Sequence, residues 1–197
     1  MTSMTDMTTM TSMTDMTTNQ QYDQVISSCK EIFLKKASDY GTAWRVLRTV
    51  SIADQIYIKA QRIRTIQEKG IQKVYDDITG EFKGIINYAI IGLIQLSLPE
   101  DAPEEMDVKQ ASTLYDEFSS QAKTVMEDKN HDYGEAWRQM SPEGFVDLIL
   151  MKLQRIKQIL TNEGKTLISE GIDANYLDMV NYAVFALILI NENSGNL

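Results

Sequence analysis

The sequence predicts an all-α protein made of two tandem three-helix repeats that pack about a pseudo-two-fold axis, as in a fused dimer. The motif Asp-Tyr-Gly-x-Ala-Trp-Arg occurs at residues 39–45 and again at residues 132–138, an offset of 93 residues (132 minus 39). Apolar residues recur at helical spacing, and the alternation typical of strands is not sustained. The third helix of each repeat is apolar nearly all round and must be buried on several sides, which the partner repeat can provide.

The first repeat reads as three helices. Apolar positions at helical spacing predict the first helix over residues 20–36. The motif then breaks this helix, because Gly41 suits a helix end or a tight turn. The second helix is expected over residues 52–69, and the third over residues 81–98, ending before Pro99.

The second repeat follows the same order. Its first helix is predicted over residues 108–128, with residues 130–133 forming a loop. Ser141 followed by proline makes a good start for the second helix, with serine as the cap and proline at the first helical position. That helix is expected to run to about Thr161, and the third helix covers residues 175–191.

Two stretches of unusual composition, at the N-terminus and between the repeats, indicate the domain boundaries. The first nine residues are repeated letter for letter as the next nine, and this polar, low-complexity sequence cannot bury a core. An acidic, proline-containing stretch separates the two repeats. We therefore expect a disordered N-terminus (residues 1–19), a first repeat (20–98), a linker (99–107) and a second repeat (108–192). Both repeats are expected to form one globular unit.

Composition excludes several classes of protein. The chain has 197 residues and a formal net charge of −9, so it lacks the basic face that binds duplex nucleic acid. The most apolar run, residues 85–98, is too short to cross a membrane, so no membrane-spanning segment is expected. Cys29 is the only cysteine, which excludes an internal disulfide and suits a reducing cytoplasm. Its apolar neighbours predict a core position.

The second helices carry a repeated set of charges. Lys59 and Arg62 are three residues apart and share a helix face, with Asp54 nearby, and the same types recur at identical offset in repeat 2. Arginine offers a bidentate fork and lysine a point charge, a combination that suits phosphate. The alternative is a charge cluster on a solvated face.

The third helix of repeat 2 carries two polar residues among apolar ones. Asp178 and Asn181 are three residues apart, and an unpaired buried polar group costs about 1–3 kcal/mol. They are expected either to hold Mg²⁺ through oxygen ligands or to pair with Lys152 or Arg155. Repeat 1 has Gly84 in place of Asp178, so its site is degenerate if Asp178 is a metal ligand or a base. Alternatively, the asparagines of the two repeats cap or cross-link helices.

The repeated motif itself offers groups for a ligand. Its tyrosine and tryptophan can stack on a flat ring, its arginine can bind an anion, and its aspartate can accept from an amine or cap a helix. Trp44 and Trp137 are the only tryptophans in the chain. The alternative is a structural turn that tryptophan anchors to the core.

Taken together, these patterns define candidate residues in both repeats. Asp178 is the candidate catalytic residue and metal ligand. The candidate ligand-binding residues are Lys36, Asp39, Tyr40, Trp44, Arg45, Asp54, Lys59, Arg62 and Asn87 in repeat 1, and Lys129, Asp132, Tyr133, Trp137, Arg138, Asp147, Lys152, Arg155 and Asn181 in repeat 2.

The motifs resemble those of a known family. The pattern K-x-x-D-Y-G-x-A-W-R, the D-x-x-x-x-K-x-x-R helix and the closing D-x-x-N-Y-A helix look like the nucleotide modification associated domain 1 family, in two tandem copies. The resemblance implies an all-α domain associated with nucleotide or modified-base metabolism. The layout is also similar to the MazG-like nucleoside triphosphate pyrophosphohydrolases, whose Mg²⁺ is held by an E-x-x-E helix and an E-x-x-D helix. The first of these is missing here, since the second helices carry lysine and arginine.

Three functional hypotheses follow. The first is a nucleotide-binding protein associated with nucleotide or modified-base metabolism, with nucleotide processing and Mg²⁺ as further options. It is expected to bind a small-molecule nucleotide or nucleotide-like ligand as a monomeric fused dimer, with further oligomerisation as an alternative. The second is a non-catalytic helical interaction module, which predicts closed pairs Asp54–Arg62 and Asp147–Arg155. The third is a MazG-like Mg²⁺-dependent pyrophosphohydrolase.

Overall fold

The computed structural model describes residues 16–70, 77–167 and 170–194, and over these residues the chain is all-α. They form six α-helices and two short 3-10 helices, η2 and η3, with no strand. Repeat 1 contains α1 (Thr18–Tyr40), η2 (Ala43–Val46), α2 (Thr49–Lys69) and α3 (Ile78–Ser97); repeat 2 contains α4 (Val108–Tyr133), η3 (Ala136–Gln139), α5 (Pro142–Thr161) and α6 (Ile172–Ser194). The predicted fold class is confirmed.

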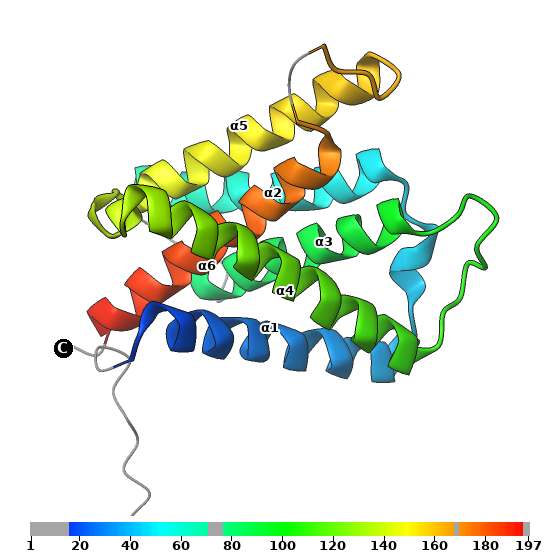
Figure 1. Cartoon of the computed structure of the whole chain (residues 1–197), viewed down its shortest axis with the longest axis horizontal. Coiled ribbons are helices and arrows are strands. Elements are labelled where there is room, and N and C mark those ends of the chain that lie inside the picture. Colours follow the sequence, from blue (N-terminus) through cyan, green and yellow to red (C-terminus); the bar gives the residue numbers. More distant parts are fainter. Residues whose placement is uncertain (1–15, 71–76, 168–169, 195–197) are drawn as a thin grey trace, which may run out of the picture.

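The third helices form the centre of the molecule. Helices α3 and α6 pack against each other, with α1 and α4 on one side of this pair and α2 and α5 on the other (Figure 1). Gly92 of α3 allows a close approach, since a Cβ atom there would lie 2.6 Å from the Tyr176 ring of α6. The apolar character of both third helices is thus explained by burial on several sides.

Reciprocal hydrogen bonds define the pseudo-two-fold axis. The Tyr22 hydroxyl of repeat 1 donates to Asn181 Oδ1 of repeat 2 at 2.8 Å, and the Tyr115 hydroxyl of repeat 2 donates to Asn87 Oδ1 of repeat 1 at 2.8 Å. Each asparagine amide also donates to a backbone carbonyl of the first helix in its own repeat, that of Cys29 or that of Ala122, at 3.0 Å. The repeated asparagines therefore cross-link three helices each.

Charged residues are exchanged in the same way. Lys30 pairs with Asp116 at 2.6 Å, and Lys123 pairs with Asp23 at 2.8 Å. A second exchange joins α2 and α5 at 3.2 Å and 3.8 Å, through the pairs Lys157–Asp54 and Arg64–Asp147. Much of the repetition in polar sequence is thus accounted for by contacts between the repeats.

The first helices are longer than predicted. Residues 130–133 were expected to form a loop, which is wrong: α4 continues through them to Tyr133, and α1 likewise continues to Tyr40. Each helix ends at the glycine of the motif, Gly41 or Gly134, where φ is 65° or 62°. Glycine adopts positive φ at little steric cost, so the break falls at the glycine rather than before the aspartate.

The beginning of the chain is ordered earlier than expected. Most of the predicted disordered segment, residues 1–15, lies outside the described residues. Thr17, however, caps α1 by accepting from the Gln20 backbone N–H, and the Gln20 side chain accepts in turn from the Thr17 backbone, which is a capping box. Thr18 and Asn19 are already helical.

One helix qualifies as a membrane span by length and composition. Among the described helices this is α6, contrary to the expectation that no segment would. Within the protein, 72% of its most apolar window is buried. Burial in the core between α3, α5 and the first helices accounts for this hydropathy.

Candidate functional site

Two equivalent cavities lie beside the repeated motifs, one in each repeat. Each is bordered by the end of the first helix, the 3-10 helix and the third helix. The repeat 1 cavity has a volume of about 330 Å³ and is lined by Ile32, Phe33, Lys36, Ala37, Tyr40, Gly41, Ala43, Trp44, Leu47, Lys59, Gly80, Lys83, Gly84, Asn87, Tyr88 and Ile91. The repeat 2 cavity has a volume of about 130 Å³ and is lined by Met126, Lys129, Asn130, Tyr133, Gly134, Ala136, Trp137, Asp178, Asn181, Tyr182 and Phe185.

The motif places its aromatic residues at these cavities. The helix end at glycine and the following 3-10 turn carry each tryptophan against the core. In repeat 1, Trp44 lies 6.3 Å from the Phe33 ring at a tilt of 41°. In repeat 2, Trp137 stacks on Phe185 at 4.2 Å with the rings nearly parallel. The tyrosines of the motif are exposed at the same cavities.

The arginines of the motif contact neighbouring protein groups outside the two cavities. Arg45 donates to the carbonyls of Ala102 and Pro103 in the linker and to Gln95, so it fastens the linker to the motif. Arg138 pairs with Glu135 and Glu192 and donates to Thr18 and Gln21. Neither arginine lines the cavity of its repeat, and neither do the exposed aspartates of the motif, Asp39 and Asp132.

Asp178 is held by two lysines in repeat 2. Lys129 donates to one carboxylate oxygen at 2.5 Å, and Lys152, only 5% exposed, donates to the other. Burial opposes ionisation of Asp178, but the hydrogen bonds from both lysines prevail and hold its pKa below the ordinary value. Pairing with Lys152 was one of the two alternatives left open by the sequence, and it is present.

Repeat 1 lacks this carboxylate. Gly84 stands at the equivalent position, and the Lys59 side chain lies across it, 2.8 Å from where a Cβ atom would be. Lys59 instead reaches Glu81 at 3.2 Å, and Arg62 donates to the same carboxylate. Lys36, the equivalent of Lys129, forms no ion pair with a described residue. The carboxylate that pairs with the second helix is therefore Glu81 in repeat 1. It lies one helical turn earlier on the third helix than the position equivalent to Asp178.

The charges of the second helices separate in space. Asp54 and Asp147 pair with Lys157 and Arg64 of the opposite repeat, whereas the interaction-module hypothesis expected pairs with Arg62 and Arg155. Lys59 and Lys152 lie toward the third helices. Helical spacing predicted that the lysine and arginine of each second helix share a face. In repeat 1 this is confirmed, because Lys59 and Arg62 contact the same carboxylate.

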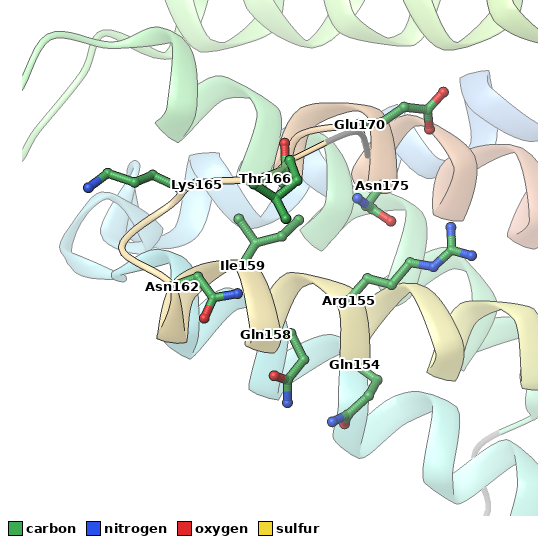
Figure 2. Close-up of a pocket in the computed structure, with 10 residues that line it drawn as sticks. Gln154, Arg155, Gln158, Ile159, Asn162, Lys165, Thr166, Glu170 and Asn175 are labelled. Carbon is green, nitrogen blue, oxygen red and sulfur yellow. The ribbon is translucent and has the colours of Figure 1, made fainter.

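Arg155 borders another cavity, of about 670 Å³, between the end of α5 and the start of α6 (Figure 2). It reaches from α5 toward the start of α6, where Asn175 replaces the glutamate found at position 81. Arg155 therefore has no carboxylate partner of the kind that Arg62 has, and forms no hydrogen bond or ion pair with a described residue.

A metal site is not supported by the geometry at Asp178. Both of its oxygens accept from ammonium groups, and a cation there would displace them. No cluster of three or more metal-ligating side chains of the His, Cys, Asp or Glu type occurs among the described residues. The donor set does not fit Mg²⁺, which prefers several oxygen ligands.

Sequence reasoning missed some lining residues. Lys83 lines the repeat 1 cavity but is not repeated, because Leu177 stands at the equivalent position. Glu81 was not among the candidate residues, although it is the carboxylate partner of the second helix. The repeat signal could find Tyr88, which recurs as Tyr182.

Comparison with known proteins agrees with this division into repeats. The family model described as nucleotide modification associated domain 1 matches residues 36–96 and 129–190, one match in each repeat. No match was found among curated proteins or among solved structures. The two matched regions span more than half of the chain and include most of the residues around both cavities. The chain therefore belongs to the nucleotide modification associated domain 1 family, as a tandem pair of domains.

Proposed function

We propose that the protein binds a nucleotide or a nucleotide-like metabolite in the repeat 1 cavity, and so acts in nucleotide or modified-base metabolism. The observation that carries this proposal is a cavity that combines aromatic rings with lysines and has no acidic residue among its described lining residues. Its family membership supports the same class of ligand. We propose binding of this ligand and no particular reaction.

The size and aromatic lining of the cavity suit a ligand with a flat ring. Its volume of about 330 Å³ lies within the range of about 300–1,000 Å³ typical of small-molecule sites. Trp44, Tyr40 and Tyr88 supply aromatic surface around it. Aromatic side chains stack on nucleobases with little dependence on sequence, at about 1–3 kcal/mol per base.

The local charge favours an anion despite the acidic chain. Lys36 and Lys83 line the cavity without an ion pair to a described residue, and Lys59 adds a third ammonium group. Gly80, in the first turn of α3, also lines it, and the N-terminus of a helix favours negative charge. A phosphate group therefore has several sources of attraction at this place.

An unpaired indole adds a further reason. The Nε1 atoms of Trp44 and Trp137 are both buried and have no hydrogen-bond partner in the described part of the chain, so this feature is shared by the two repeats. An unsatisfied buried donor costs about 1–3 kcal/mol. A ligand acceptor beside Trp44 would remove that cost.

The other two hypotheses account for less. The interaction-module hypothesis accounts for the asparagines and for the exchanged ion pairs, but leaves the lysine-lined cavity without a role. The pyrophosphohydrolase hypothesis needs carboxylates that hold Mg²⁺, and in the described part of the chain no carboxylate lines the repeat 1 cavity.

The two tryptophans allow a direct test. In a Trp137→Phe variant, Trp44 is the only tryptophan and reports on the repeat 1 cavity. We expect nucleoside mono- and triphosphates to change its fluorescence in a saturable manner. The matched Trp44→Phe variant, which keeps Trp137 alone, should respond little. Absence of any saturable change across a panel of purine and pyrimidine nucleotides would remove the support for nucleotide binding.

A further inference from the structure

The two repeats present the same pair of lysines to different surroundings. In repeat 2, Lys129 and Lys152 both donate to the Asp178 carboxylate. In repeat 1, the equivalent residues are Lys36 and Lys59, and the carboxylate is replaced by the hydrogen atom of Gly84. The lysine pair is therefore kept where Asp178 has no counterpart, and Lys59 pairs instead with Glu81, one helical turn earlier.

A second difference concerns the aromatic ring. In repeat 2, the Phe185 ring stacks on Trp137 at 4.2 Å and 6°. The equivalent of Phe185 in repeat 1 is Ile91, so no ring of α3 takes that place against Trp44. The repeat 2 cavity is correspondingly smaller, at about 130 Å³ against about 330 Å³.

We infer that α6 occupies the repeat 2 cavity with side chains that take the places of a ligand, so that, of these two equivalent cavities, the one in repeat 1 is open. The Asp178 carboxylate stands where an anionic group of the ligand lies between Lys36 and Lys59. The Phe185 ring stands where a flat ring of the ligand stacks on Trp44. The ligand class is therefore an aromatic ring joined to a phosphate or carboxylate, and its identification as a nucleotide rests on the function proposed above.

The spacing of the two side chains limits the ligand. Asp178 and Phe185 are seven residues apart on one helix, which places their Cα atoms about 10 Å apart along the axis. A ring that carries a phosphorylated sugar is of this length. A free base, or inorganic phosphate, would fill only one end of the cavity.

The first test closes the open site. Calorimetric titration of the full chain with a nucleoside monophosphate should give one site per chain, and the corresponding nucleoside should bind at least tenfold more weakly. Gly84→Asp should reduce the affinity for the monophosphate at least tenfold, because the new carboxylate takes up Lys36 and Lys59. Gly84→Asn is the matched control of nearly equal volume, and it should lose less affinity than Gly84→Asp. Equal losses in the two variants would overturn the role of the anion.

The second test opens the closed site. Asp178→Gly leaves Lys152 buried without its partner, so the melting temperature should fall. Formate or phosphate should raise the melting temperature of this variant by several degrees relative to chloride at equal ionic strength. The same anions should raise the melting temperature of wild type by less. In a Lys152→Met, Asp178→Gly variant the extra gain should disappear. A gain from formate or phosphate no greater than that from chloride would contradict the inference, and if Asp178→Gly does not fold, the Gly84 variants decide alone.

The outcomes separate this inference from the proposed function. If pyrophosphate binds wild type but not Gly84→Asp, while no nucleotide binds, the anion position stands and the nucleotide proposal fails. If nucleotides bind wild type and Gly84→Asp equally well, the proposed function stands and the inference is wrong.

Discussion

The two repeats share a fold and a set of cross-links but differ in how they treat their charges. In repeat 2 the buried carboxylate of Asp178 pairs with two lysines, and the neighbouring cavity is smaller, at about 130 Å³. In repeat 1 the carboxylate of Glu81 lies one turn earlier, against Lys59 and Arg62, and the cavity beside Gly84 stays open.

This difference separates two kinds of repeated residue. Those with a reciprocal partner in the opposite repeat, such as Tyr22 and Tyr115, hold the halves together. Those around the cavities keep the same types while their surroundings change. Repetition alone marks both kinds, and only the contacts distinguish a structural residue from a candidate ligand-binding residue.

The largest expected effect is on stability at Asp178. Removing one partner of a buried ion pair leaves an uncompensated charge, so Asp178→Ala should lower the free energy of unfolding by about 3–5 kcal/mol. Glu81→Ala should cost less, roughly 1–2 kcal/mol, because Lys59 and Arg62 are about a quarter exposed and regain water. Urea unfolding followed by circular dichroism at neutral pH measures both. Equal costs would show that the two carboxylates are equivalent after all.

A smaller effect tests the symmetry. Tyr22→Phe and Tyr115→Phe each remove one buried hydrogen bond to an asparagine, which should cost about 1–3 kcal/mol. Because the two bonds are related by the pseudo-two-fold axis, the costs should agree within about 0.5 kcal/mol, comparable to the additivity of independent sites. Urea unfolding measures both costs. A clear difference between the costs of Tyr22→Phe and Tyr115→Phe would show that the two hydrogen bonds are not equivalent.

The smallest effect under ordinary conditions concerns pH. The folded-state pKa of Asp178 lies below its ordinary value of 3.8, because the hydrogen bonds from Lys129 and Lys152 outweigh the effect of burial. The stabilisation is therefore complete above the unfolded-state pKa and is lost as pH falls through the folded-state pKa. The difference in unfolding free energy between wild type and Asp178→Asn should stay constant from about pH 5 upward and shrink in more acid solution. A difference that shrinks toward alkaline pH instead, below the range where lysine titrates, would contradict this assignment.

Much of the architecture could be predicted from the sequence. Helical spacing of apolar residues indicated the six helices, and the all-round apolar third helices indicated that the halves pack together, as α3 and α6 do. Cys29 was expected in the core and is fully buried there. The ends of α1 and α4 were placed too early, because positive φ at the motif glycine, not the preceding aspartate, stops the helix.

The site could be predicted only in part. Lys36, Tyr40, Trp44, Lys59 and Asn87 were grouped from the repeat, and all five line one cavity. The sequence could not show which repeat has the larger cavity, because the Asp178 carboxylate is equally consistent with binding a ligand and with occupying the place of one. Its role follows from the side chains packed around it in three dimensions.

The covalent joining of the halves has an evolutionary consequence. In an assembly of two identical chains, every substitution appears twice, so a residue that seals one pocket seals both. Tandem fusion lets position 84 and position 178 change independently while the shared Tyr–Asn contacts stay intact. One half is thereby free to serve as scaffold, and the other to diversify toward a new small molecule.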